Sequence, residues 1–107
     1  NNQYKFFKIT KNVDPSFFGF PIFLTKLHSK RKTKLINLLN RRGIENRPII
    51  SGNFLNQPAA KLYKFKQLAK NFPGAQKVQE RGFFIGLHAK PITNQNLKLI
   101  VDSLLSF

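Results

Sequence analysis

An acidic and a basic residue two positions apart, Glu45 and Arg47, are the first candidates for chemistry in this chain of 107 residues. They lie in a segment expected to be extended, Ile44 to Ser51, where side chains two apart point to the same side of a sheet. Together they could offer a carboxylate acceptor and a planar guanidinium donor to a hydroxyl-rich or phosphorylated ligand. The same spacing also suits an ordinary surface ion pair, which contributes little to stability. Both interpretations stay open on spacing alone.

Two further groups could contact a ligand. Gly52 would let the backbone approach a ligand closely before the Asn53 amide is presented. The aromatic segment Gly82–Gly86 has a glycine at each end, and His88 follows it, where an imidazole could donate to a substrate or a phosphate. The alternative for the second group is a core strand followed by a histidine that faces solvent.

Several kinds of site are not expected. The chain has no cysteine, which excludes disulfides and thiolate ligands, and its two histidines, His28 and His88, accompany only four carboxylates. We therefore expect no metal site. No serine, histidine and acid follow a nucleophile pattern, and no glycine-rich loop matches a phosphate cradle. No residue is predicted to be catalytic or to bind a cofactor by itself.

The charge is the strongest compositional feature, with 19 lysines and arginines against 4 acids and a net charge of +15. It supports an alternative hypothesis, a free-standing basic module that binds nucleic acid or another polyanion. However, lysine outnumbers arginine 14 to 5, and most lysines are scattered singly. Base reading and bidentate phosphate binding favour arginine, so nucleic acid is not expected as the main partner.

Location is indicated only by what the sequence lacks. No apolar run approaches the roughly 20 residues of a membrane-spanning helix, and the first residues do not follow the order of a signal peptide. We therefore expect a cytoplasmic protein with no membrane partner. The chain begins with Asn1 rather than methionine, which suggests a fragment.

Strands and helices are predicted to alternate along the chain. Phe17–Thr25 is rich in aromatic and branched residues and is predicted to be a strand, with Pro21 favouring an edge position or a bulge. A helix should follow, with Ser29 as N-cap and a stop at Gly43 after Arg41 and Arg42. Its apolar face is Leu35, Ile36, Leu38 and Leu39.

The second half should contain a strand at Ile44–Ser51, a helix at Ala59–Lys70 opened by Pro58, and a helical turn at Ala75–Arg81. A strand at Gly82–Gly86 and a helix at Asn94–Leu105 complete the order. The residues of the last helix expected to face inward are Leu97, Ile100, Val101, Leu104 and Leu105.

This order predicts an α+β fold, a small two-layer domain with a mostly antiparallel sheet of about three strands covered by helices. We expect a lead-in segment over residues 1–16 and the small domain over residues 17–107.

Five segments in order along the chain resemble one family. They are Ser16–Pro21, Gly43–Phe54, Gln57–Ala59, Phe72–Ala75 and Gly82–His88. They resemble the C-terminal domain of the DegT/StrS nucleotide-sugar aminotransferases and, within that family, the sugar 3-dehydratases. The chain departs from the family pattern at Phe17, Asn46 and Leu87, where tryptophan, threonine and asparagine are usual.

The resemblance implies a fold-type-I homodimer that uses pyridoxal phosphate and acts on a nucleotide sugar in surface-polysaccharide synthesis. The cofactor would be bound by an N-terminal domain that this chain lacks, and the small domain would close the substrate cleft. The isolated chain would be inactive, and its partners would be its own N-terminal domain and a second subunit. Dehydration and transamination stay open, because the deciding lysine or histidine lies outside the chain. By position, the resemblance makes Glu45, Arg47, Asn53 and His88 the substrate-binding residues. In that fold we expect Glu45 and Arg47 to touch, or nearly touch, on the cleft-facing side of the middle strand, with Asn53 at the same rim and the Gly82–Gly86 strand alongside.

Overall fold

The computed structural model describes residues 2–107. Its elements in chain order are β1 Tyr4–Phe6, β2 Gly19–Leu24, the 3-10 helix η1 Lys26–Arg31, α1 Lys32–Arg41, β3 Asn46–Pro48, three further 3-10 helices η2 Phe54–Asn56, η3 Pro58–Leu62 and η4 Ala69–Asn71, α2 Pro73–Arg81, β4 Gly82–Gly86 and α3 Asn94–Leu105.

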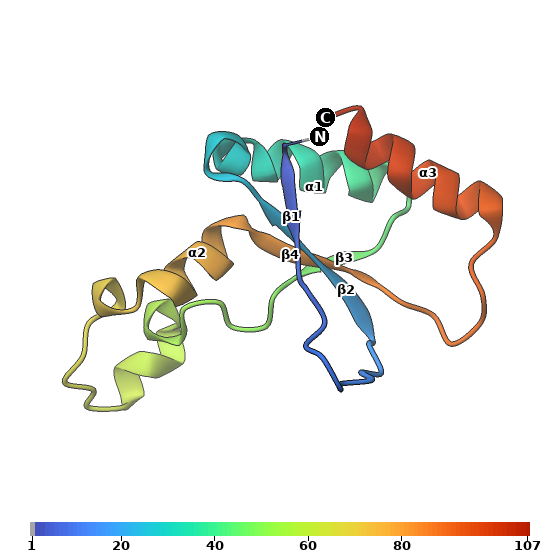
Figure 1. Cartoon of the computed structure of the whole chain (residues 1–107). Coiled ribbons are helices and arrows are strands. Elements are labelled where there is room, and N and C mark those ends of the chain that lie inside the picture. Colours follow the sequence, from blue (N-terminus) through green and yellow to red (C-terminus); the bar gives the residue numbers. More distant parts are fainter. Residues whose placement is uncertain (1) are drawn as a thin grey trace.

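The strands form one antiparallel sheet in the order β1-β2-β4-β3. The predicted α+β class, a small antiparallel sheet with helices over it, is confirmed. The sheet has four strands rather than about three because the lead-in segment supplies β1, which pairs with β2 from Tyr4 to Phe6. In Figure 1, α1 and α3 lie together over one side of the sheet, while α2 and η2 to η4 form a lobe at the lower left.

One face of the sheet and α1 form the core. Ile22 on β2 lies opposite Phe83 on β4, and both are fully buried beside Leu35 and Leu39 of α1. Burying a side chain of this size stabilises a fold by about 1.5–3 kcal/mol. The complete core is Ile22, Leu24, Leu35, Leu39, Ile44, Phe83 and Ile85.

The turn between α1 and β3 is set by Gly43, as predicted. Gly43 has a φ of 70°, and its N–H donates to Asn40 O at 3.0 Å while Ile44 N–H donates to Leu39 O at 2.9 Å. These two bonds define a Schellman motif, which requires a left-handed residue at this position. The predicted N-cap was wrong: Ser29 lies inside η1, where its Oγ donates to Lys26 O at 2.9 Å.

Pro21 is not on an edge strand, because β2 pairs with both β1 and β4. The sheet accommodates it by ending β1 early. Thr25 N–H donates to Gln3 O and therefore points toward β1. Backbone N–H groups alternate in direction along a strand, so the nitrogen of Pro21, four residues earlier, also points toward β1. Pairing on that side ends at Ile22, opposite Phe6, so the nitrogen of Pro21 has no carbonyl of β1 to meet.

The predicted helix at Ala59–Lys70 is absent. Only the short 3-10 helices η3 and η4 form there, because a longer helix would have no surface on which to bury its apolar residues. Those residues are largely exposed, Leu62 at 84% and Tyr63 at 60%. The predicted strand Ile44–Ser51 is likewise reduced to β3, since Ile50 and Gly52 adopt positive φ angles and turn the chain out of the sheet.

Helix α3 has the predicted bounds but buries a narrower face. Ile100 and Leu104 pack against the core and Ser103 is fully buried. Leu97, Val101 and Leu105, also expected to face inward, are 43–55% exposed because α3 contacts the rest of the domain along one edge only. Tyr4 ties this helix to β1 by donating its hydroxyl hydrogen to Leu104 O at 2.7 Å.

The described residues form an open shape. Their radius of gyration is 15.8 Å, whereas a compact domain of this length would have about 13 Å. The lobe leaves an apolar surface uncovered, made of Phe54, Leu62, Tyr63, Phe65, Leu68 and Phe72. No helix among residues 2–107 is both long enough and apolar enough to cross a bilayer.

The hydrogen bond of Tyr4 predicts a measurable loss of stability in Tyr4→Phe. Removing the hydroxyl should lower the free energy of unfolding at pH 7 by about 1 kcal/mol in urea denaturation. Tyr63→Phe, at an exposed ring, is the matched control and should change it by less than about 0.5 kcal/mol.

The difference in the free energy of unfolding between wild type and Tyr4→Phe should also depend on pH. Burial raises the pKa of Tyr4, against a lowering contribution from Arg31. The folded chain therefore favours the neutral phenol. This stabilisation is present below the pKa that Tyr4 has in the unfolded chain, and it is lost as the pH rises through the higher pKa that Tyr4 has in the folded chain. The difference should shrink above about pH 10; a constant difference would show that the hydroxyl does not titrate with folding.

Candidate functional site

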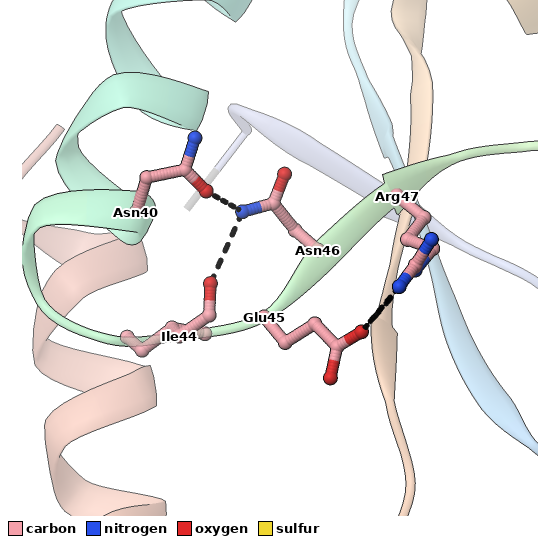
Figure 2. Close-up of polar contacts among 5 residues, drawn as sticks. All are labelled: Asn40, Ile44, Glu45, Asn46 and Arg47. Carbon is pink, nitrogen blue, oxygen red and sulfur yellow. Dashed lines mark hydrogen bonds and ion pairs between the residues drawn. The ribbon is translucent and has the colours of Figure 1, made fainter.

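The turn after α1 determines which way Glu45 and Arg47 point. Ile44 is buried, and the Asn46 amide donates to Asn40 Oδ1 at 2.7 Å and to Ile44 O at 3.1 Å. Asn46 thus faces α1, and alternation turns its neighbours Glu45 and Arg47 to the opposite side (Figure 2).

Glu45 and Arg47 touch, as predicted. Arg47 donates from Nε at 3.2 Å and from Nη2 at 3.0 Å to the same carboxylate oxygen, Oε1 of Glu45. The second carboxylate oxygen and Nη1 of the guanidinium are not used in this contact, so they could serve a ligand. Because the two side chains are 65% and 68% exposed, the pair adds at most about 1 kcal/mol to stability.

The strand that carries this pair lies at the edge of the sheet rather than in the middle, where it was expected. The β1 strand occupies the other edge, so β4 takes the central position beside β3. The expected neighbourhood of the Gly82–Gly86 strand is confirmed: Arg47 lies opposite Phe84, and Phe84 lies opposite Pro21. Since Phe83 is in the core, these three residues occupy the face turned away from α1 and α3.

A groove brings Glu45 and His88 together. It has a volume of about 300 Å³ and lies between the α1–β3 turn, the end of β4 and the first half of α3. Its polar lining residues are Arg42 and Glu45, on either side of the turn between α1 and β3, together with His88 after β4 and Asn96 in α3, and most of the other lining residues are apolar. The full lining is Arg42, Gly43, Ile44, Glu45, Ile85, Gly86, His88, Ile92, Asn96, Leu99 and Ile100.

Asn53 lies apart from this groove, in the lobe. It is 2% exposed, and its Nδ2 donates to Ala69 O at 2.9 Å and to Gln76 Oε1 at 3.3 Å, while Oδ1 accepts from Leu55 N–H at 3.3 Å. Gly52 permits a close approach, as expected, but by α2 rather than a ligand: a Cβ there would lie 2.7 Å from Cβ of Gln79. The geometry gives Asn53 a structural role, and its substrate-binding role stays a prediction.

Sequence reasoning missed two groove residues, Arg42 and Asn96. The sequence placed Arg42 only at the end of the predicted helix. The contact that fixes it, Nη1 donating to Ser103 Oγ at 2.9 Å, joins residues 61 positions apart. No local pattern signals a contact at that separation.

No protein-family model matches the chain. Curated relatives do match: it is 30% identical to a dTDP-4-dehydro-2,6-dideoxy-D-glucose 3-dehydratase of Saccharopolyspora spinosa over 92% of this chain and 21% of that protein. It is 26% identical to a lipopolysaccharide biosynthesis protein of Salmonella typhimurium over 92% of this chain and 22% of that protein.

Solved structures agree with this match. A GDP-4-keto-6-deoxy-D-mannose-3-dehydratase of Escherichia coli with bound hydrated pyridoxal phosphate superimposes with a TM-score of 0.75 at 28% identity, over 92% of this chain and 25% of that one. A GDP-4-keto-6-deoxymannose-3-dehydratase mutant with bound GDP-perosamine gives 0.74 at 25% identity, over 98% and 26%. This chain is a homologue of the sugar 3-dehydratases. It spans about a fifth of the length of the curated relatives it matches.

Glu45 is the one acid among the groove residues, and no lysine lines the groove. All four acids of the chain are exposed. Lys32 is half-buried, which lowers its pKa, but its Nζ donates to Gln79 O at 2.9 Å between α1 and α2. The described part of the chain also lacks any cluster of three metal-ligating side chains.

The buried position of Asn53 predicts that Asn53→Ala destabilises the chain by about 1–3 kcal/mol, because the lobe loses its central amide and buried partners are left unpaired. Chemical denaturation measures this. Asn37→Ala, at an exposed position of α1, is the control and should be neutral or slightly stabilising. Unchanged stability of Asn53→Ala would contradict the structural role and favour a ligand-binding one.

Proposed function

We propose that this chain is the C-terminal small domain of a pyridoxal-phosphate-dependent nucleotide-sugar 3-dehydratase of the DegT/StrS family. The observation that carries the proposal is homology to the sugar 3-dehydratases over nearly the whole chain, with the Glu45–Arg47 pair turned to an exposed face. Dehydration is preferred to transamination because the named enzymes among the relatives and structures reported above are 3-dehydratases.

In this proposal the domain orients the sugar rather than carrying out the bond-breaking chemistry. The free Glu45 oxygen would accept a hydrogen bond from a sugar hydroxyl, and Arg47 would donate to a hydroxyl or carbonyl oxygen of the substrate. The contact between the two side chains fixes both before the ligand arrives, which reduces the entropy lost on binding. His88, which lines the same groove as Glu45, would contact the same ligand. Asn53 would hold the lobe in place.

The cofactor would be bound outside this chain, by an N-terminal domain of a longer protein. Two features support such a partner, the radius of gyration of 15.8 Å and the exposed apolar surface of the lobe. A homodimer with the active site between subunits, a cytoplasmic location and a role in surface-polysaccharide synthesis complete the proposal. The match to a lipopolysaccharide biosynthesis protein supports the last of these.

The polyanion-binding alternative has less support, because several members of the basic clusters make structural contacts. The Arg31 guanidinium lies 4.4 Å from the ring centre of Phe107, Lys32 bonds to Gln79 O, and Arg42 bonds to Ser103. These three side chains thus serve the packing of η1 and α1 against α2 and the C-terminal part of the chain.

Arg47→Ala in the longer protein tests the proposal. Losing a guanidinium that holds a polar substrate should weaken recognition by about 2–5 kcal/mol, a drop in kcat/KM of at least about 30-fold. Because the side chain is exposed, the melting temperature should hardly change. Arg41→Ala removes the same charge from an exposed position at the end of α1 and should leave kcat/KM within about twofold. Near-normal turnover by Arg47→Ala would show that Glu45 and Arg47 form only a surface ion pair.

A second prediction concerns the cofactor. The 107-residue chain, dialysed with pyridoxal phosphate at micromolar concentration, should retain much less than one equivalent by absorbance. Its lysines are exposed or, for Lys32, bonded to Gln79 O, and none lines the groove. The longer protein should retain about one per subunit. Stoichiometric retention by the chain alone, abolished by one lysine substitution, would place the cofactor site in this domain instead.

A further inference from the structure

Arg42 is held in the groove by a buried hydroxyl. Its Nη1 donates to Ser103 Oγ at 2.9 Å, and Ser103 Oγ in turn donates to Leu99 O at 2.6 Å. Ser103 is fully buried although it is polar, so its hydroxyl is part of the packed interface between the α1–β3 turn and α3. The bond uses one of the five N–H donors of the guanidinium and leaves the others for a ligand in the groove.

The backbone of Arg42 is fixed as well. Arg42 is the C-cap of α1, and the Schellman bonds of Gly43 and Ile44 hold the turn that follows it. A long side chain that is anchored at its backbone and at its tip loses little further freedom on binding a ligand.

The positive charge of Arg42 is not cancelled by an acid. Within residues 2–107 the single ion pair joins Arg47 to Glu45, so the one carboxylate in the groove is already paired with another arginine. The groove therefore combines a neutralised acid with an anchored guanidinium, which favours an anion with several acceptor oxygens.

We infer that Arg42 binds a phosphate group in this groove and that Ser103 is the residue that positions it. The inference rests on the proposed function only for the source of that group, the diphosphate of the nucleotide sugar. Glu45 lies three residues from Arg42 in sequence, so their backbones are at most about 11 Å apart. A diphosphate at Arg42 would therefore be joined to a hexose that contacts Glu45, which lines the same groove.

The test is a titration of the 107-residue chain with inorganic pyrophosphate at about 0.15 M salt, which screens the general attraction of a chain with charge +15. Amide chemical shifts report the site. Saturable shifts are expected at Gly43 and Gly86, and Arg42→Ala should weaken binding by about tenfold. Arg41→Ala removes the same charge from the adjacent residue and should weaken it by less than about twofold.

Ser103→Ala separates positioning from charge. It keeps the guanidinium but removes its anchor, so pyrophosphate affinity should fall by about threefold or more in protein that is still folded by its amide spectrum. A hydroxyl that served only the packing of α3 would leave the affinity of the folded chain unchanged.

Equal losses in Arg41→Ala and Arg42→Ala, or shifts confined to the basic start of α1, would overturn the inference in favour of diffuse attraction. Because no turnover is measured, failure of the dehydratase assignment would leave this result in place. Conversely, absence of pyrophosphate binding would leave the Arg47→Ala test of the proposed function intact.

Discussion

The structure depends on apolar contact between one face of the sheet and α1. The strands are three to six residues long, and such short strands are not stable without a packed face. Ile22 and Phe83 supply that face from the two central strands, and Leu35 and Leu39 cover it from α1.

This contact also determines where polar chemistry can lie. Because side chains alternate along a strand, burying Phe83 and Ile85 turns Phe84, and its partner Arg47, to the opposite face. The left-handed turn at Gly43 then brings Glu45 to the same face, and Arg42 before the turn and Glu45 after it both line the groove. The position of the candidate site therefore follows from the packing of the core and from one glycine.

Sequence patterns correctly predicted those features of the fold that depend only on residues close together in the chain. The glycines of β4 and the stop at Gly43 gave correct boundaries, because their conformational requirements are local. The contact of Glu45 with Arg47 was predictable from period-two spacing for the same reason. The apolar pattern of Ala59–Lys70 failed because a helix needs a surface to pack on, which spacing does not reveal. The burial of Asn53 and the link from Arg42 to Ser103 join distant residues, so no short pattern contains them.

In the proposed function, the open shape and the exposed pair have one explanation. A domain that presents Glu45 and Arg47 to a ligand would leave its own second face uncovered around that pair, whereas near Gly82 the side chain of Ile49 and the Val78 carbonyl lie close to the backbone. The aromatic residues of the lobe then remain at the surface, which is unfavourable for an isolated domain and useful for one that packs on a larger body. With two internal hydrogen bonds and side chains that are 65% and 68% exposed, the Glu45–Arg47 pair is oriented but open to solvent. In the proposed function, a second surface closing over the pair would remove water and strengthen its contacts with the substrate, so the pair would form half of a cleft whose strength comes from closure.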